Sequence, residues 1–123
     1  MQPQNSFVSG ILAEKAACSL LSEKGFQIIE QNYKGIRGTS AGEIDIIAVD
    51  EDARLLVFVE VKQRSTHALA GECITTKQQE RIAVGAQIFL DRNKKYSGFD
   101  CRFDAILFDA DGAALHLENA FGM

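Results

Sequence analysis

The sequence contains no tryptophan, a single proline and only three cysteines in its 123 residues. The cysteines Cys18, Cys73 and Cys101 are odd in number and far apart, and no pair has the CxxC spacing that is typical of zinc sites. These absences argue against a disulfide framework and against a structural zinc ion. We therefore expect a cytoplasmic protein whose thiols are reduced.

Long apolar runs and an excess of positive charge are missing too. No run approaches the ~20 apolar residues that a membrane-spanning helix needs, and the N-terminal stretch MQPQNSFVSGILAEK lacks the basic region and apolar core of a signal peptide. The net charge of −4 argues against a protein that coats nucleic acid through a broad positive field. It still permits an enzyme with a local basic rim, and we expect no membrane partner.

The remaining composition is that of an ordinary globular domain. Hydrophobic residues make up 46% of the chain and charged residues 24%, which gives no sign of disorder. Because a division into two domains would leave neither half a proper core, we expect residues 1–123 to form one domain.

Hydrophobic periodicity predicts an α/β protein with the element order α-β-β-β-α-β-β. The expected helices cover Ser6–Lys24 and Lys77–Asn93, and the expected strands cover Phe26–Tyr33, Glu43–Val49, Leu55–Lys62, Arg102–Phe108 and Ala114–Glu118. Gly25 is expected to end the first helix, and Thr76 with Gln79 to form a capping box at the start of the second. His67 and His116 have no partner at metal-ligand spacing, so we expect both to be structural.

The second and third strands are predicted to form a hairpin with charged residues at the end far from the turn. Antiparallel pairing across a turn at Glu51–Arg54 places Asp45 opposite Glu60. The same register places Glu43 opposite Lys62. The other face of the hairpin is apolar throughout, so we expect the hairpin to be central and covered on both sides.

The facing acids need a chemical explanation. Two opposed carboxylates with Cβ atoms roughly 5 Å apart repel each other unless a proton or a cation lies between them. Mg²⁺ prefers such oxygen ligands, and the carbonyl of Val61 could add another. Lys62 could orient or deprotonate an attacking water, or stabilise charge on a phosphate. The alternative is a pair of solvated strand ends, with Glu43 and Lys62 in a surface ion pair.

The motifs GEID at Gly42–Asp45 and FVEVKQR at Phe58–Arg64 resemble the PD-(D/E)xK superfamily of restriction-endonuclease-like nucleases. From GILAE at Gly10–Glu14 to RFD at Arg102–Asp104, the chain resembles the YraN-like family of small bacterial proteins. The same core resembles archaeal Holliday-junction resolvases and RecB-type nuclease domains. This resemblance implies a restriction-endonuclease-like fold with a central mixed β-sheet flanked by helices. One departure is that Glu-Ile replaces the proline that precedes the first Asp in much of the superfamily.

The resemblance also implies roles for individual residues. Asp45 and Glu60 would bind Mg²⁺ or Mn²⁺, and Lys62 would be the catalytic lysine. Glu14 matches an acid that approaches the site in resolvase-like members, although it could equally be a solvated helix residue. A further set is expected to support the metal or to contact substrate, and it comprises Glu43, Arg64, Lys77 and Gln78. Arg81 is expected only in a basic rim around the acids.

These features predict a metal-dependent phosphodiesterase that acts on nucleic acid, with DNA, branched or structured, as the first candidate. The rival prediction is an accessory module that binds nucleic acid or a protein partner without cleaving anything. A homodimer is left open.

Overall fold

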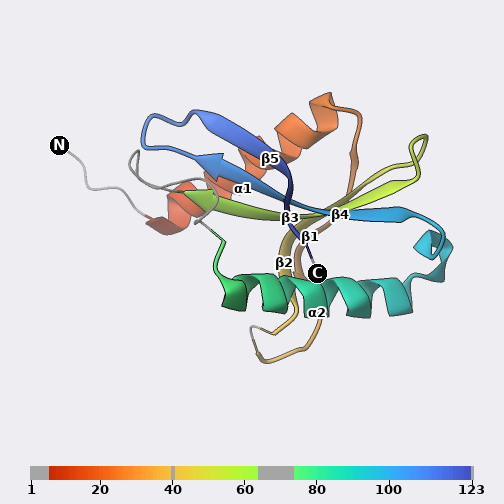
Figure 1. The fold of residues 1–123 in the computed structure, drawn as a ribbon. Coiled ribbons are helices and arrows are strands. Elements are labelled where there is room, and N and C mark those ends of the chain that lie inside the picture. Colours follow the sequence, from red (N-terminus) through yellow and green to blue (C-terminus); the bar gives the residue numbers. More distant parts are fainter. Residues whose placement is uncertain (1–5, 40, 64–73, 123) are drawn as a thin grey trace.

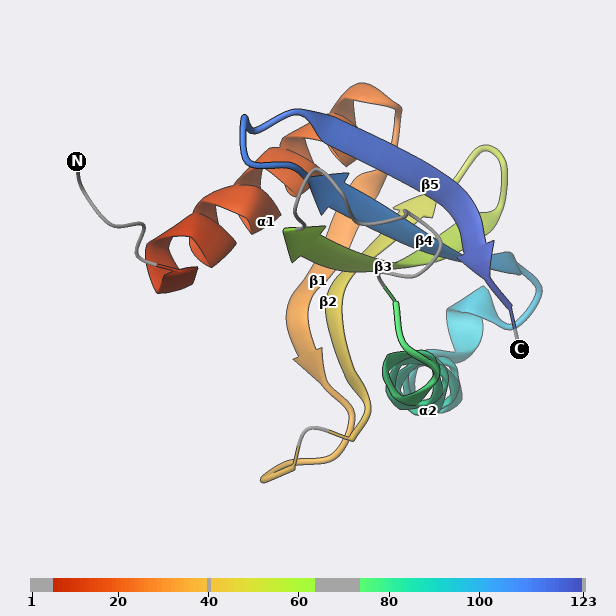
Figure 2. The same cartoon turned by 60° about the vertical axis from the view of Figure 1, so that its left-hand side comes forward.

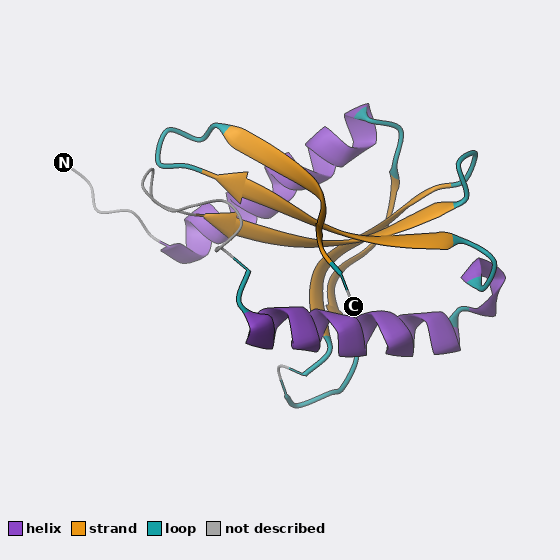
Figure 3. Cartoon of the chain, viewed as in Figure 1, coloured by secondary structure: helices purple, strands orange, loops and turns teal. Residues whose placement is uncertain are grey.

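The computed structural model describes residues 6–39, 41–63 and 74–122. Its elements are α1 (Ser6–Glu23), β1 (Gln27–Lys34), β2 (Glu43–Asp50), β3 (Leu55–Gln63), α2 (Thr76–Arg92), the short 3₁₀ helix η2 (Lys94–Tyr96), β4 (Asp100–Phe108) and β5 (Ala114–Phe121). The predicted order α-β-β-β-α-β-β is therefore confirmed, with η2 as an addition. Figures 1 and 3 show the strands in one layer, with α1 and α2 on opposite sides of it.

The five strands form one mixed sheet in the order β1-β2-β3-β4-β5. The central strand β3 runs parallel to β4, while the other neighbouring pairs are antiparallel. A parallel pair needs a long crossover connection, and α2 lies in that connection. The predicted turn over Glu51–Arg54 is confirmed, because Asp50 pairs with Leu55 across it.

Both faces of the sheet are buried, as the hairpin pattern predicted. Phe58 of β3 packs with Phe89 of α2 in the cluster on one face. Val59, the next residue of β3, packs with Leu21 of α1 in the cluster on the other. Each large apolar side chain that is fully buried in this way contributes about 1.5–3 kcal/mol to the free energy of folding. The centre of the sheet therefore fixes the position of every side chain that β3 carries.

The alternation of faces along β2 breaks at Asp45. Ile46 and Ala48 pack on the α1 side, and strict alternation predicts the same side for Ile44. That prediction is wrong, because Ile44 is buried in the cluster on the α2 side, where Tyr33 also packs. The reason is a bend: Figure 2 shows the β1–β2 ribbon curving away from the rest of the sheet and passing beside α2.

Two glycines allow this close passage. A Cβ atom on Gly85 of α2 would lie 2.3 Å from the carbonyl oxygen of Gly42, a separation that real Cβ atoms do not tolerate. Gly42 itself has a φ of +78°, which favours glycine. Because Gly42 comes shortly before Asp45, this contact helps to set the position of the acid.

The helix ends follow known capping rules. At the end of α1, Phe26 N–H donates to the Leu21 carbonyl (3.0 Å) and Gly25 N–H to that of Ser22 (3.0 Å), which is the Schellman arrangement, and Gly25 has the expected positive φ. At the start of α2 the prediction of Thr76 and Gln79 is wrong by one residue. Over the described ranges, no helix has both the length and the apolar character needed to cross a membrane.

The capping box of α2 is made by Thr75 and Gln78. The Thr75 hydroxyl accepts from Gln78 N–H at 3.1 Å, and the Gln78 side chain accepts from Thr75 N–H at 2.9 Å. The doublets Thr75-Thr76 and Gln78-Gln79 offer the same chemistry in two registers. In the structure Gln79 donates its side-chain amide to the Ile74 carbonyl instead (3.1 Å), which leaves Thr75 as the N-cap.

We predict opposite effects on stability for two Gly→Ala substitutions in helices. Gly85→Ala forces a methyl group against Gly42 and should lower the free energy of unfolding by about 1–3 kcal/mol. Gly10→Ala on α1 meets open space and should raise it by up to about 1 kcal/mol through helix propensity. Urea denaturation of both variants and the wild type measures the two effects. Equal stability of the two variants would contradict the proposed contact.

Candidate functional site

The acids predicted on β2 and β3 come together where the two strands stop pairing. The β2–β3 ladder runs from Asp50 with Leu55 to Ile46 with Val59. Asp45 is the neighbour of Ile46, one residue beyond the last pair of this ladder. Its Oδ2 accepts a hydrogen bond from the N–H of Val61 at 2.8 Å. The β2 carboxylate is thereby held against β3 by a bond to the main chain.

Glu60 is a buried acid, with only 3% of its surface exposed. Its Oε2 accepts a hydrogen bond from Arg81 Nη2 at 2.8 Å and lies 4.0 Å from Lys62 Nζ. Its Oε1 is buried and has no hydrogen-bond partner among the described residues. A buried oxygen without a partner is costly and rare in folded proteins.

The pKa of Glu60 reflects these surroundings. Burial raises it first, the negative charge of Asp45 raises it further, and a side-chain hydrogen bond between protonated Glu60 and Asp45 adds to the rise. The positive charges of Arg81 and Lys62 act in the opposite direction, but the pKa still reaches about 7. Ionising both Glu60 and Asp45 is therefore unfavourable, and a proton or a cation between them would stabilise the pair.

Glu14 approaches this site from α1. Partial burial and the negative charge of Asp45 raise the pKa of Glu14, while a hydrogen bond with the side chain of Asn32 opposes the shift. Asp45 thus interacts electrostatically with Glu14 as well as with Glu60. Within the described ranges, however, no three His, Cys, Asp or Glu side chains gather closely enough to form a complete metal cage.

Glu43 forms an ion pair with Lys34 and not with Lys62. Its Oε2 forms an ion pair with Lys34 Nζ on the neighbouring strand β1. The alternative of a Glu43–Lys62 ion pair is therefore wrong, since Lys62 lies beside Glu60 instead. Pairing with Lys34 follows from the β1–β2 register, in which these two residues are opposite each other.

The substrate residues predicted on the second helix lie along a groove at the start of α2. This groove has a volume of ≈ 490 Å³ and is lined by Ala41, Thr75, Lys77, Gln78, Glu80, Arg81 and Val84. Gln78 contributes to the groove, although its side-chain oxygen is already used in the capping box. Arg64 lies outside the described residues, so its predicted place near the groove stays a prediction.

Arg81 lies closer to the acids than the rim position that the sequence suggested. Besides contacting Glu60, it lines a small cavity together with Lys34, Glu43 and Asp45. One signal could have identified it: Arg81 follows Lys77 by four residues, so both occupy one face of α2.

A second buried acid, Asp104 of β4, is fully hydrogen-bonded. It accepts from Arg102 Nε and Nη2 (2.9 Å each), from His116 Nε2 (2.8 Å) and from the N–H of Asn119 (2.9 Å). Burial alone would raise the pKa of Asp104, but these hydrogen bonds hold it below its ordinary value. His116 also contacts Lys24 Nζ through Nδ1 (2.7 Å), which fits the structural role expected for it.

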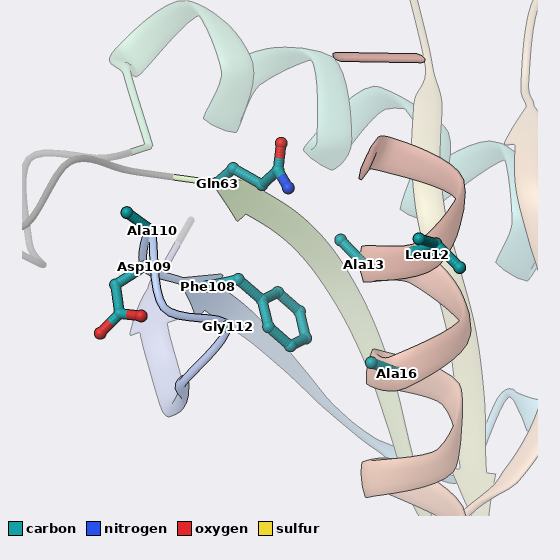
Figure 4. Close-up of a pocket in the computed structure, with 8 residues that line it drawn as sticks. All are labelled: Leu12, Ala13, Ala16, Gln63, Phe108, Asp109, Ala110 and Gly112. Carbon is teal, nitrogen blue, oxygen red and sulfur yellow. The ribbon is translucent and has the colours of Figure 1, made fainter. Parts of the chain in front are cut away.

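Another cavity, of ≈ 270 Å³, lies between the N-terminal half of α1 and the β4–β5 turn. Figure 4 shows its lining, and among these described residues Asp109 is the one acid. The Asp109 Oδ1 accepts from the N–H groups of Asp111 (2.9 Å) and Ala113 (3.0 Å), so this carboxylate stabilises the turn. The described lining of this cavity offers no arrangement for acid–base or metal chemistry comparable to that around Glu60.

Comparison with known proteins gives consistent results. A model of the uncharacterised protein family UPF0102 matches residues 13–108. A UPF0102 protein of Azorhizobium caulinodans is 40% identical over 118 residues, which are 96% of this chain and 86% of that protein. Another, from Francisella tularensis, is 39% identical over 116 residues, which are 93% of this chain and 94% of the relative.

A solved structure extends the comparison to the fold. Archaeoglobus fulgidus Hjc, a Holliday junction resolvase, superimposes with a TM-score of 0.59 at 19% sequence identity. The match covers 89% of this chain and 76% of that one. The predicted restriction-endonuclease-like fold is confirmed.

We predict that Glu60 makes the stability of the metal-free protein fall as the pH rises. Since its pKa is raised from 4.5 to about 7, the folded state binds the proton more tightly than the unfolded state does. The contribution of Glu60 is therefore full below pH 4.5 and is lost between pH 4.5 and about 7, by up to about 3 kcal/mol.

Glu60→Gln should remove this loss, because the amide stays neutral throughout. The measurement is the free energy of unfolding in urea from pH 5 to 8, with a chelator present, for wild type and variant. Both proteins share the same histidines, so the difference between the two curves isolates Glu60. Parallel curves would show that Glu60 does not carry the raised pKa.

Proposed function

The chain belongs to the UPF0102 family, as its YraN-like motifs predicted, and from the site it carries on a resolvase-like fold we propose that it is a metal-dependent nuclease. The proposed reaction is hydrolysis of phosphodiester bonds in nucleic acid, with branched or structured DNA as the first candidate substrate. The proposed cofactor is Mg²⁺ or Mn²⁺. The proposed compartment is the cytoplasm, in which the free thiols of Cys18 and Cys101 stay reduced.

One observation carries this proposal: the buried Glu60 has an oxygen that accepts no hydrogen bond from the described residues, and it interacts with the charge of Asp45. A hard divalent cation binds carboxylate oxygens, and Mg²⁺ often uses only one or two protein carboxylates and completes its coordination with water. The pair of Asp45 and Glu60 therefore fits such an ion without a third acid. The carbonyl of Val61 is a further candidate ligand.

The bound ion would supply Lewis acidity at the scissile phosphate and make a coordinated water easier to deprotonate. The side chains of the site would orient the ion, the water and the phosphate. Asp45 is oriented by the N–H of Val61, which holds its carboxylate in a fixed direction. Lys62, beside Glu60, would orient or deprotonate the attacking water, or stabilise the negative charge that develops on the phosphate. Glu14 would act from the α1 side as an additional acid.

Substrate binding is assigned to the groove at the start of α2. Lys77 and Arg81 supply positive charge there, and the N-terminus of a helix attracts anions. Gln78 would contribute its remaining side-chain amide, and Arg64 its charge. Glu43 is held by Lys34, so we assign it to the support of this region and not to the metal.

We predict that Mn²⁺ or Mg²⁺ raises the melting temperature and that Asp45→Asn abolishes this effect. An ion that binds only the folded state stabilises it by about 2.7 kcal/mol when present at about 100 times its Kd. The measurement is thermal unfolding with and without millimolar metal. Glu43→Gln is the matched control: it removes one charge from the same strand and should keep the stabilisation. A wild-type melting temperature that does not respond to metal would count against a preformed site.

We further predict that Lys62→Ala lowers the rate of cleavage without a matching loss of affinity. A group that acts on the water or on developing charge acts in the transition state, so its loss should reduce the single-turnover rate by about 10²–10⁴-fold. Lys77→Ala is the matched control. It should weaken binding and reduce its salt dependence, because Lys77 contributes charge toward phosphate.

The substrates to be compared are single-stranded, duplex, flap and four-way-junction DNA, and RNA. Equal cleavage rates for wild type and Lys62→Ala would remove Lys62 from the mechanism. A wild type that binds but cleaves none of these substrates with metal present would favour the accessory module, in which Arg81 serves as the permanent counter-ion of Glu60.

A further inference from the structure

Arg81 lies at the boundary between the acidic site and the groove. Its Nη2 donates to Glu60 Oε2 at 2.8 Å, while its Nε is buried and has no partner among the described residues. The same side chain lines both the small cavity that contains Asp45 and the larger groove that contains Lys77. The Arg81 side chain is 25% exposed to solvent. Arg81 can therefore reach either region from one position on α2.

Ionised Glu60 already has matching positive charges beside it before any metal binds. In that state, which a metal ligand must reach, Asp45 and Glu60 carry two negative charges, and Lys62 and Arg81 carry two positive ones. A divalent cation bound by the two acids would leave an excess of two positive charges beside a carboxylate that is only 3% exposed. Such an excess is costly where water is largely excluded. The cation and the guanidinium would also compete for the same carboxylate.

On these grounds we propose that Arg81 is an exchangeable counter-ion: it neutralises Glu60 in the metal-free protein and is released to bind substrate phosphate in the groove when a divalent cation takes its place. This inference rests on the proposed metal site. It adds a consequence that a fixed site lacks, namely that metal binding and polyanion binding strengthen each other. By linkage, each ligand raises the affinity for the other by the same factor.

The released Arg81 side chain would move to the part of the groove that Lys77 lines. Lys77 lies on the same face of α2, one turn before Arg81, and it lines the same groove. With Arg81 on Glu60, the positive charge of the groove is offset by Glu80, which also lines it. With Arg81 released, the groove gains one positive charge. A phosphate bound there would also offset the excess charge that the cation brings to Glu60.

The first experiment measures Mn²⁺ affinity of the full chain by calorimetry without nucleic acid. Arg81→Gln should bind Mn²⁺ more tightly than wild type, because no guanidinium competes for Glu60. Lys77→Gln is the charge-matched control: it removes a positive charge one turn away on the same helix, from the lining of the groove and without contact to Glu60, so its effect should be much smaller. Equal gains for the two variants would overturn the exchange.

The second experiment measures coupling to a polyanion. Fluorescence anisotropy gives the Kd for a labelled four-way DNA junction with Mg²⁺ or with chelator. The junction is made with hydrolysis-resistant linkages, so that it stays intact while every protein keeps Lys62 and its charge beside Glu60. Added Mg²⁺ ordinarily weakens protein–DNA binding by screening. With Arg81 present, it should instead strengthen binding, by about 5- to 150-fold, the common range for coupled sites.

Three variants separate the outcomes. Arg81→Gln should lose the coupling and show only the weakening by salt, whereas Arg81→Lys, which keeps the charge, should restore part of it. Lys77→Gln should bind the junction more weakly but keep the coupling. Retained coupling in Arg81→Gln, or none with Arg81 present, would overturn the exchange. If wild type binds no Mn²⁺ in the first experiment, the metal site and the exchange both fail; if it binds Mn²⁺ without coupling, only the exchange fails.

Discussion

The burial of one carboxylate, that of Glu60, is the constraint on which the rest of this site depends. β3 is the central strand and is covered by a helix on each side, so a charge placed on it is removed from water at considerable cost. The structure offsets that cost only partly: Arg81 and Lys62 approach one oxygen, and the other oxygen has no described partner. A fold that needed Glu60 only for stability would gain by replacing it with an apolar residue.

The surrounding architecture serves to bring a second acid to Glu60. The β1–β2 ribbon bends at Asp45, and this bend sends Ile44 into the core on the α2 side. The close contact of Gly42 with Gly85 permits the bend, and the N–H of Val61 fixes the carboxylate that results. The glycine contact and the Val61 hydrogen bond, which are far apart in the sequence, therefore act together to position Asp45 beside Glu60.

The sequence predicts the larger features well because they depend on local periodicity. The element order, the β2–β3 turn and the helix end at Gly25 all follow from short-range patterns. The errors occur where two local solutions are equivalent or where tertiary contacts decide. Thr75 and Thr76 offer equal caps, the side chosen by Ile44 depends on packing against α2, and the contact of Arg81 with Glu60 joins elements that no local pattern relates.

The contrast between Glu60 and Asp104 explains why one buried acid is assigned to chemistry and the other to structure. Both lie in the middle of the same sheet, on neighbouring strands. Asp104 accepts four hydrogen bonds, two on each oxygen, and its pKa is lowered, so its charged form is stabilised by groups that cannot leave without loss. Glu60 has one oxygen that accepts no hydrogen bond from the described residues, and its pKa is raised, so Arg81 and Lys62 compensate its charged form only in part. Since a buried charge persists only when something compensates it, the incomplete compensation at Glu60 leaves a place for a ligand that the sheet itself does not provide.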